Sequence, residues 1–380
     1  MTRPLHKLYV ALFIGVLSLL SLGSLTGVLN YQLPRQFSLL DGGLAKTFES
    51  HYDQHFPLKT VGTNVWAALD YLLFNAGRPG VLIGERDWLY SDEEFKPVAD
   101  GQQQLHDNLA LIRGVQAHLA QRDVLLVLAV VPAKARLYPE NIGEHPISPL
   151  RQDLYQRFHR ALRRADIAAP DLLQPLQAGK ARGQLFLRTD THWTPLGAEI
   201  AAQHLSQGVQ AAVKLDGEPQ LFVTEATGQT AYQGDLSRFL PLDPLFSQLL
   251  PDADQLQQRE THAAQPQDNA AALLGEVELP VALVGTSYSA NPAWNFAGAL
   301  RQHLQRDLSN HAEDGQGPIV PMLKYLQSEE FKNSPPQLVI WEFPERYLPM
   351  ANNLDDFDPA WLATLKSPNG QQRLASSNSH

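Results

Sequence analysis

Three short, largely apolar runs constrain the fold of this chain more than any other feature of its sequence. They lie at residues 124–131, 281–284 and 337–343, and Pro132 and Pro344 follow the first and the last of them. An apolar run of this kind is typical of a strand buried on both faces, as in a parallel sheet. Segments with helical periodicity separate the runs. The alternation of strand and helix predicts an α/β fold with a doubly wound, mostly parallel sheet.

The remaining elements are expected from local patterns. Thr194 is a good N-cap and Pro195 a good first residue for a helix. Helices are expected over residues 44–52, 64–75, 105–121, 150–165, 195–212 and 292–306, a hairpin over 81–90 with its turn near 85–87, and a short strand at 184–187.

The N-terminal segment predicts a membrane anchor. Residues 8–29 carry no charge, and a helix of that length is about 33 Å long, enough to cross a hydrocarbon core of about 30 Å. Arg3 and Lys7 precede this segment, which favours a cytoplasmic N-terminus and a translocated remainder. The alternative is a cleaved signal peptide. The apolar run is longer than a usual signal-peptide core, however, and no Ala-x-Ala site follows it.

These patterns divide the chain into three parts. Residues 1–34 are expected to form the cytoplasmic N-terminus and the anchor, and residues 35–366 a single domain in the periplasm of a bacterium. A surface excursion, rich in Gln and Ala, is expected within that domain at residues 251–280. Residues 367–380 are polar and aperiodic, which predicts a disordered tail.

Composition and motifs exclude several classes of function. The chain has 40 acidic against 30 basic residues, a formal charge of -10, and no basic patch, so nucleic-acid binding is not expected. The absence of cysteine excludes disulfides, thiol catalysis and cysteine-ligated metals. A metal site built on Asp190 and His192 would need a third ligand that the sequence does not identify. We therefore expect neither a metal nor a cofactor.

Two short segments carry the residue types of acyl transfer. In Asp190-Thr191-His192, an extended backbone would point the carboxylate and the imidazole to the same side. Ser287 follows the apolar run at 281–284 through Gly285-Thr286. A serine hydroxyl needs a base to become a nucleophile, and a histidine oriented by a carboxylate suits that role. Because each segment follows an expected strand, both should meet at the carboxyl edge of the sheet.

Each segment also has an ordinary structural interpretation. Asp190 could cap a turn while His192 is a surface residue, and small residues at a strand-to-helix turn are common. Ser289 competes with Ser287 as the nucleophile. Lys134 follows a strand and could lie near the site, although a structural role is favoured.

Neighbouring residues are candidates for substrate binding. Trp193 could form a wall that excludes water, and Asn291 and Asn295 could donate hydrogen bonds to an oxyanion. The candidate substrate-binding residues next to the two segments are Trp193, Tyr288, Asn291 and Asn295.

Together these segments resemble the alginate O-acetyltransferase group, a family of SGNH-hydrolase-like periplasmic proteins. The matching segments are residues 52–56, 80–90, 131–139, 188–197, 284–291, 294–296 and 341–347. The resemblance implies that Asp190 is the orienting acid, His192 the base and Ser287 the nucleophile. It also implies that Tyr347 lies near the pocket. The order Asp, His, Ser differs from that of most SGNH hydrolases and fits the permuted arrangement of this family.

The resemblance implies O-acetylation of the exopolysaccharide alginate through an acyl-enzyme. The acetyl group would come from a membrane-bound O-acyltransferase, and other periplasmic alginate acetylation proteins would be partners. A related soluble member carries a carbohydrate-binding module that is not expected here. An acidic chain without such a module should bind a negatively charged polyuronate weakly, so we expect an acetyl relay or a weak transferase. A polysaccharide acetylesterase and a non-catalytic scaffold remain the alternatives.

Overall fold

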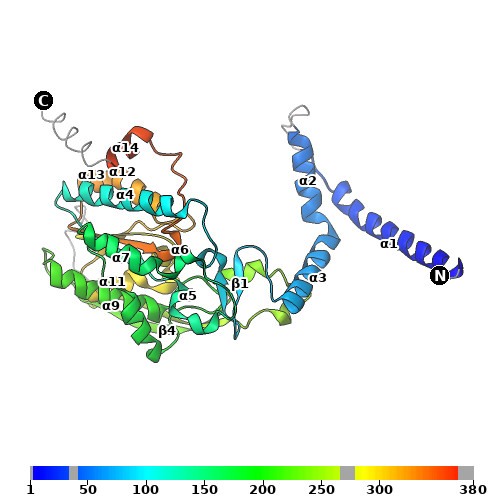
Figure 1. The fold of residues 1–380 in the computed structure, drawn as a ribbon, viewed down its shortest axis with the longest axis horizontal. Helices are drawn as coiled ribbons and strands as arrows, with labels where there is room; N and C mark the ends of the chain where they lie inside the picture. The colour runs from blue at the N-terminus through cyan, green and yellow to red at the C-terminus, as the bar shows by residue number, and fades with distance from the viewer. Residues whose placement is uncertain (1–2, 34–41, 266–278, 367–380) are drawn as a thin grey trace. The chain divides into compact units, whose positions relative to one another are not determined.

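The computed structural model describes residues 3–33, 42–265 and 279–366 (Figure 1). The chain forms two compact units. The smaller comprises Met1–Arg78 and Arg238–Leu250, and the larger comprises Pro79–Ser237 and Pro251–His380. The expected boundaries at residues 34 and 366 stay a prediction, and the expected tail at 367–380 lies outside the described residues.

A four-stranded parallel sheet forms the centre of the larger unit. Its strands are β3 (Leu125–Val131), β6 (Val281–Val284), β7 (Leu308–Asn310) and β8 (Leu338–Pro344). They lie in the order β3-β8-β6-β7, and every neighbouring pair is parallel. Almost every residue of β3, β6 and β8 is buried, which explains their apolar sequences. The predicted α/β fold with a parallel sheet is confirmed.

Helices cover both faces of this sheet (Figure 1). The helix α9 begins as its sequence predicts, because the Thr194 side chain accepts a hydrogen bond from the N–H of Gly197 at 3.2 Å. The helix expected over 150–165 is instead two helices, separated at Asp153. The helices of this unit are α4 (Gly101–Ala120), α5 (Lys134–Leu137), α6 (Pro149–Gln152), α7 (Leu154–Arg164), α8 (Leu173–Gly179), α9 (Pro195–Ala212), α10 (Ser287–Ala290), α11 (Phe296–Leu304), α12 (Ile319–Gln327), α13 (Glu329–Asn333) and α14 (Pro359–Lys366).

The strand expected at 184–187 does not form, and this prediction is wrong. The segment turns back on itself instead. The N–H of Leu187 donates to the carbonyl of His192 at 3.1 Å, and the N–H of Thr194 donates to that of Leu185 at 2.8 Å. Leu185 and Leu187 are apolar because they fill the core, not because they belong to the sheet. Residues 185–194 therefore form a closed loop, called the acid loop below.

A long antiparallel ribbon forms where no strand was expected. It consists of β4 (Phe222–Tyr232) and β5 (Asp254–Ala263). The surface excursion expected at 251–280 includes this strand β5, several of whose residues are exposed, while residues 266–278 lie outside the described residues. Most residues of β4 are exposed, and β5 alternates half-buried and exposed residues beyond Leu256, so neither strand has the apolar pattern of a core strand. The two strands form by pairing with each other.

A short hairpin opens the larger unit as predicted. Strands β1 (Val81–Ile83) and β2 (Leu89–Ser91) pair antiparallel. At the turn, Arg86 and Asp87 adopt φ values of 55° and 63°, the left-handed region that such turns often use.

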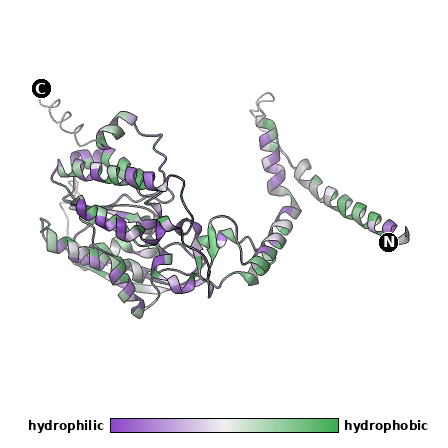
Figure 2. Ribbon diagram, viewed as in Figure 1, coloured by the Kyte–Doolittle hydropathy of each residue, from purple (hydrophilic) through white to green (hydrophobic). Residues whose placement is uncertain are grey.

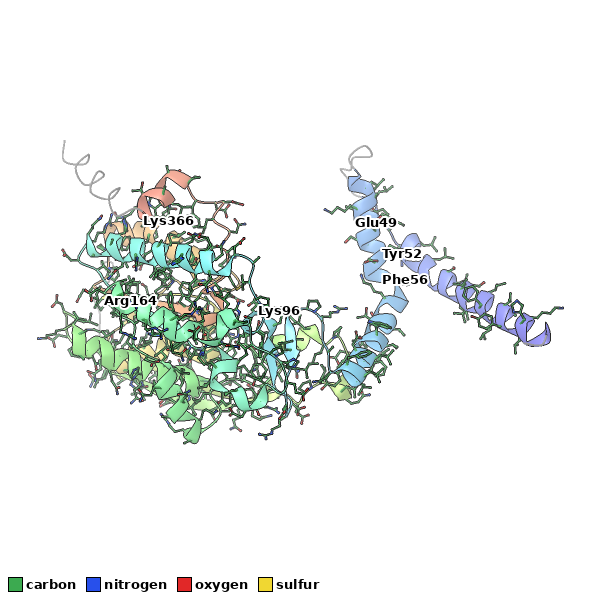
Figure 3. The ribbon with its side chains drawn as sticks, viewed as in Figure 1. Glu49, Tyr52, Phe56, Lys96, Arg164 and Lys366 are labelled. Atoms are coloured by element: carbon green, nitrogen blue, oxygen red, sulfur yellow. The ribbon has the colours of Figure 1, made fainter. Side chains whose placement is uncertain are left out.

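The smaller unit contains the helices α1 (Arg3–Leu29), α2 (Gly43–His55) and α3 (Pro57–Phe74). The helices expected over 44–52 and 64–75 are thus confirmed. Tyr52 and Phe56 stack at the end of α2 with ring centroids 5.6 Å apart (Figure 3). Within the described residues, no helix has both the length and the apolar character that crossing a membrane requires, so the expected spanning helix is not supported.

Candidate active site

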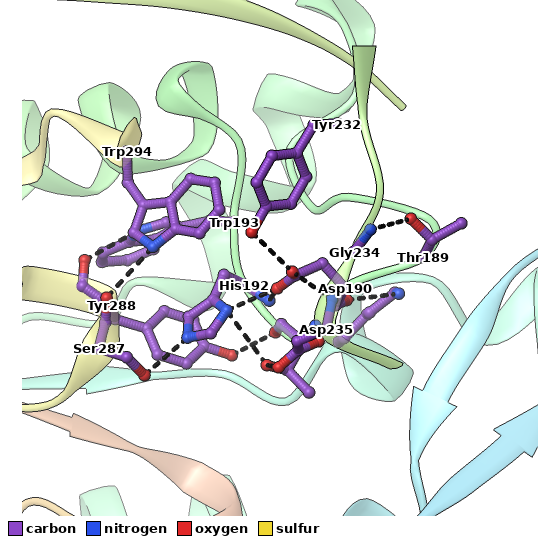
Figure 4. A network of polar contacts seen from close by, with 12 residues as sticks. Thr189, Asp190, His192, Trp193, Tyr232, Gly234, Asp235, Ser287, Tyr288 and Trp294 are labelled. Carbon is purple, nitrogen blue, oxygen red and sulfur yellow. Dashed lines mark hydrogen bonds and ion pairs between the residues drawn. The ribbon is translucent and has the colours of Figure 1, made fainter. Parts of the chain in front are cut away.

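Three predicted side chains form a continuous line of hydrogen bonds (Figure 4). The Oγ of Ser287 lies 2.7 Å from the Nε2 of His192. The Nδ1 of His192 lies 2.5 Å from the Oδ1 of Asp190. Ser287 begins α10, directly beyond the end of β6, whereas the other two lie in the acid loop. The fold therefore brings together groups that are 95 residues apart in the chain.

Four donors surround the carboxylate of Asp190, which has no exposed surface. Oδ1 accepts the backbone N–H of His192 at 2.8 Å as well as its ring. Oδ2 accepts the N–H of Asp235 at 2.8 Å and the hydroxyl of Tyr232 at 3.2 Å. Burial acts to raise the pKa of Asp190, but the hydrogen bonds and charge of His192, together with the Asp235 N–H, hold that pKa well below its ordinary value. The ionised carboxylate fixes the proton on Nδ1 and leaves Nε2 to accept one.

Aromatic rings hold the imidazole of His192 in place. The ring of Trp294 stacks on it with centroids 5.3 Å apart and an angle of 21° between the planes. The ring of Tyr288 lies 4.6 Å away on a tilted plane. The indole N–H of Trp294 also donates to the carbonyl of Ser287 at 3.2 Å. Base and nucleophile are thus positioned by the same side chain. In this arrangement, the imidazole can take the hydroxyl proton as a bond to carbon forms.

Asp235 ties the acid loop to the chain that follows β4. Its carboxylate accepts the N–H and the hydroxyl of Thr191 at 2.9 and 2.8 Å. The sequence alone did not point to Tyr232 or Asp235, because Tyr232 ends β4 and Asp235 follows it, and the sequence pattern did not predict this ribbon. The polar Tyr-Gln-Gly-Asp stretch at residues 232–235 was the signal that could have identified them.

Lys134 lies under the acid loop. Its buried ammonium donates to the carbonyl oxygens of Leu89, Arg188 and Asp190 at 2.5, 2.8 and 2.9 Å. Burial lowers its pKa to about 8. Two of these bonds hold the acid loop and the third ties Lys134 to β2, which agrees with the structural interpretation of Lys134.

Glu342 lies behind the turn that carries Ser287. This residue of β8 is fully buried, and its carboxylate accepts the N–H of Thr286 at 2.7 Å and the hydroxyl of Ser289 at 3.1 Å. A Cβ on Gly285 would lie 2.5 Å from this carboxylate, so only glycine fits there. The hydroxyl of Ser289 thus points to Glu342, whereas that of Ser287 points to His192. A single acidic residue in an apolar strand was the signal that could have identified Glu342.

Glu342 is expected to make the stability of the protein depend on pH. Burial raises its pKa to about 7 from 4.5. The folded protein then holds a proton that the unfolded chain releases, so the free energy of unfolding falls as pH rises between these values. Because Gln does not titrate, Glu342→Gln should remove a fall of roughly 3 kcal/mol between pH 4.5 and pH 8.

Urea unfolding of the unmodified protein and of Glu342→Gln at several pH values in this range measures the difference between their free energies of unfolding. Glu329→Gln is the matched control, since Glu329 is exposed on α13. Its profile should follow that of the unmodified protein. Parallel profiles for the unmodified protein and Glu342→Gln would contradict the assignment.

Two of the predicted substrate-binding residues lie in the core. Trp193 has no exposed surface, and its indole N–H donates to the carbonyl of Tyr288 at 3.2 Å. Tyr288 is also buried, and its hydroxyl donates to the carbonyl of Thr191 at 2.5 Å. These two bonds tie the acid loop to α10, and the two side chains offer little or no surface to a substrate.

The side chains of the other three candidates hydrogen-bond to other groups of the protein. The side chain of Asn291 accepts the N–H of Ala293 at 3.0 Å. Asn295 donates to the hydroxyl of Thr261 on β5 at 3.0 Å. The hydroxyl of Tyr347 accepts from the guanidinium of Arg346 at 3.3 Å. A role in substrate binding stays a prediction for these residues, as catalysis does for Asp190, His192 and Ser287.

The same region holds a third residue, Asp235, that could act as the metal ligand the sequence did not identify. Atoms of Asp190, His192 and Asp235 that could bind a metal lie within 4.8 Å of one another. Nδ1 of His192 already faces Asp190. The carboxylates of Asp190 and Asp235 each accept one N–H and one O–H donor from other residues. A cation would have to displace these bonds, so the donor set favours a hydrogen-bonded network over a metal centre.

Comparison with known proteins gives one consistent result. Residues 81–345 match the family model of the SGNH hydrolase-like domain of the acetyltransferase AlgX. The chain is 55% identical to the probable alginate O-acetylase AlgJ of Pseudomonas putida, over 100% of this chain and 99% of the relative. It is 54% identical to the corresponding protein of Pseudomonas aeruginosa, over 99% and 98%. The solved O-acetyltransferase domain of P. putida AlgJ is similar, with a TM-score of 0.71 and 57% identity, over 76% of this chain and 99% of that domain.

Proposed function

The chain belongs to the SGNH hydrolase-like acetyltransferase family of AlgX and is an O-acetyltransferase, and on this premise we propose that it acetylates alginate through an acetyl-enzyme on Ser287. The observation that carries the proposal is the line of hydrogen bonds from Ser287 through His192 to Asp190. The names of the relatives suggest the acceptor, because they are described as probable alginate O-acetylases.

The first half of the reaction loads the enzyme. Nε2 of His192 takes the hydroxyl proton while the Oγ of Ser287 attacks the acetyl carbonyl carbon. Asp190 stabilises the imidazolium that forms. The bond between the carbonyl carbon and the donor oxygen then breaks, and the imidazolium gives its proton to that oxygen. The products are acetyl-Ser287 and the free donor alcohol.

The second half transfers the acetyl group. His192 takes the proton of a sugar hydroxyl while its oxygen attacks the acetyl-serine carbonyl. The ester bond to Ser287 breaks, and the imidazolium returns its proton to the serine oxygen. Water in place of the sugar would give an esterase, so exclusion of water decides the outcome.

The acetyl donor that we propose is a membrane-bound O-acyltransferase, with other alginate acetylation proteins as partners. Coenzyme A esters are not expected outside the cytoplasm, where an exopolysaccharide is modified. The chain would act as a weak transferase or as a relay, in which the hydroxyl of a second periplasmic protein takes the place of the sugar hydroxyl, since its charge of -10 repels a polyuronate. Titration with mannuronate oligomers tests the relay. We expect no binding at micromolar concentrations, and micromolar affinity would contradict it.

We further propose that the chain lies at the inner membrane with its bulk in the periplasm. Arg3 and Lys7 ahead of an uncharged segment support this orientation. A reporter enzyme that is active only in the periplasm should be active when it is fused after residue 366. Carbonate extraction should leave the chain in the membrane fraction. A cytoplasmic reporter signal or full extraction would overturn the proposal.

The acetyl content of secreted alginate tests the function itself. In an alginate-producing bacterium without its own copy of this protein, the unmodified chain should restore acetylation and Ser287→Ala should not. Restoration by Ser287→Ala would instead favour a scaffold. Acetyl loss from pre-acetylated alginate in the presence of the purified chain, without any transfer, would favour an esterase.

A further inference from the structure

The side chain of Tyr232 contacts two of the groups that support the imidazole of His192 (Figure 4). Its hydroxyl donates to Oδ2 of Asp190 at 3.2 Å, while Oδ1 of the same carboxylate faces His192. The rings of Tyr232 and Trp294 meet edge to face, with centroids 5.6 Å apart and an angle of 81° between the planes. Trp294 in turn stacks on His192 and donates to the carbonyl of Ser287. Tyr232 therefore reaches the acid directly, and the base and the serine through Trp294.

The base of the ribbon fixes Tyr232 against the acid loop. In the register of the ribbon, Tyr232 lies opposite Asp254, the first residue of β5. The buried carboxylate of Asp254 accepts the N–H groups of Arg188 and Thr189 at 3.0 Å each, and the hydroxyl of Thr189 at 2.8 Å. Both strands therefore hold the acid loop, β5 at residues 188 and 189 and β4 at Asp190.

A close approach of two backbones keeps this end of β4 in place. Gly234 follows Tyr232 by two positions, and its N–H donates to the hydroxyl of Thr189 at 3.0 Å. A Cβ on Gly234 would lie 2.2 Å from the carbonyl carbon and oxygen of Thr189, so no larger residue fits. Main-chain contacts thus help to set where the Tyr232 hydroxyl lies relative to Asp190.

The ribbon also holds the segment that carries Trp294. A helix such as α7 has both hydrophobic and hydrophilic residues along its turns and buries the hydrophobic ones (Figure 2). The ribbon lacks that pattern, so polar contacts are important for its position. On β5, the hydroxyl of Thr261 accepts the side-chain amide of Asn295, next to Trp294, at 3.0 Å. The two strands therefore contact both halves of the site.

The Tyr232 hydroxyl is important because Oδ2 of Asp190 has few other donors. Among the described residues, the other donor to this oxygen is the N–H of Asp235 at 2.8 Å. Burial, together with the charge of Asp190, raises the pKa of Tyr232 well above its ordinary value, so the phenol stays protonated and remains a donor. Hydrogen bonds to carboxylates are among the stronger ones in proteins. Without this bond, the carboxylate can tilt and carry the imidazole out of line with Ser287.

We propose that Tyr232 is a positioning residue for acetyl transfer, whose hydroxyl fixes the carboxylate of Asp190 and whose ring fixes the indole of Trp294 around His192. The inference rests on the proposed function, because it concerns the same imidazole. The ribbon β4–β5 is then part of the active-site architecture, although Tyr232 acts through its neighbours and not on the acetyl group.

Steady-state hydrolysis of a small acetyl ester by the full chain tests the proposal. Tyr232→Phe keeps the ring on Trp294 and removes only the donor to Asp190. We expect kcat to fall at least about fivefold, because a small displacement of the imidazole slows proton transfer. KM should stay unchanged, since Tyr232 supports the transition state without binding the ester. Tyr232→Leu, which also removes the ring, should lower kcat further.

Two comparisons separate positioning from stability. Tyr155→Phe is the matched control, because the Tyr155 hydroxyl donates to Asp171 at 3.0 Å and accepts two buried N–H groups, all outside this network. It should cost stability and leave kcat almost unchanged. Tyr232→Phe with Asp190→Asn should be no slower than Asp190→Asn alone, since Tyr232 acts through Asp190.

The outcomes distinguish this inference from the proposed function. With Ser287→Ala inactive, a full kcat in Tyr232→Phe, or a loss that adds to that of Asp190→Asn, would overturn the positioning role alone. Full turnover by Ser287→Ala would overturn the proposed function and the positioning role with it. A thermal melt of each variant checks that the protein compared is folded.

Discussion

Replacement of Ser287 by alanine is expected to lower the turnover of small acetyl esters by at least about 10^4-fold. The Oγ of Ser287 is the atom that His192 faces at 2.7 Å, and the variant has no other hydroxyl at that position. The side chain is small, so its removal should leave the stability of the fold almost unchanged. Steady-state hydrolysis of an acetyl ester by the purified protein provides the measurement.

Ser289→Ala is the matched control for this experiment. Its hydroxyl lies two residues further along α10, but donates to Glu342 at 3.1 Å instead of facing the imidazole. Its loss should cost stability, because a carboxylate loses a donor, while most of the turnover remains. The reverse result, with Ser289→Ala inactive and Ser287→Ala active, would identify Ser289 as the nucleophile.

Asp190→Asn should lower turnover by about 10^3- to 10^4-fold. The amide that replaces the carboxylate carries no charge to stabilise the imidazolium. Its NH2 group would face either His192 Nδ1 or the N–H of Asp235, both of which bond to Asp190 in the structure. With the NH2 group at Nδ1, the ring favours the tautomer with its proton on Nε2, which cannot accept the serine proton. With the NH2 group at Asp235, two N–H donors face each other and the network around His192 is disturbed.

Two further variants make the prediction for Asp190 specific. Asp171→Asn changes a carboxylate that accepts the hydroxyl of Tyr155 at 3.0 Å, outside the network around His192, and should retain turnover. The double variant Asp190→Asn with Ser287→Ala should be no slower than Ser287→Ala alone, because the residues act as one unit. Additive losses would indicate that Asp190 acts independently of the serine.

Local sequence patterns predicted the three central residues because each pattern carries its own physical constraint. Ser287 follows a buried strand, and Asp190 precedes His192 by two positions. The expectation that both segments follow strands of the sheet holds for only one of them. Ser287 does follow a strand of the sheet, but Asp190 and His192 lie in the acid loop, which hydrogen bonds close on itself. Apolar residues in a short run report burial, and burial alone does not distinguish a strand from a packed loop.

The supporting residues could not be predicted from local patterns. Tyr232 and Asp235 reach Asp190 and its loop only because the polar ribbon β4–β5 forms, and its strands pair without an apolar face. Glu342 is an acidic residue whose role depends on which strand lies beside β6. Trp294 was part of a family resemblance, yet its stacking on His192 is a property of the folded chain. These contacts are set by tertiary structure.

The most direct test of the central claim is peptide mass spectrometry of the protein after brief exposure to an acetyl ester. An acetyl-enzyme adds about 42 Da to the peptide that carries the nucleophile. We expect this addition on the peptide that contains Ser287, with fragmentation placing it on that serine, and no addition in Ser287→Ala. An acetyl group trapped on Ser289 or elsewhere, or ester consumed equally fast by Ser287→Ala, would contradict the claim.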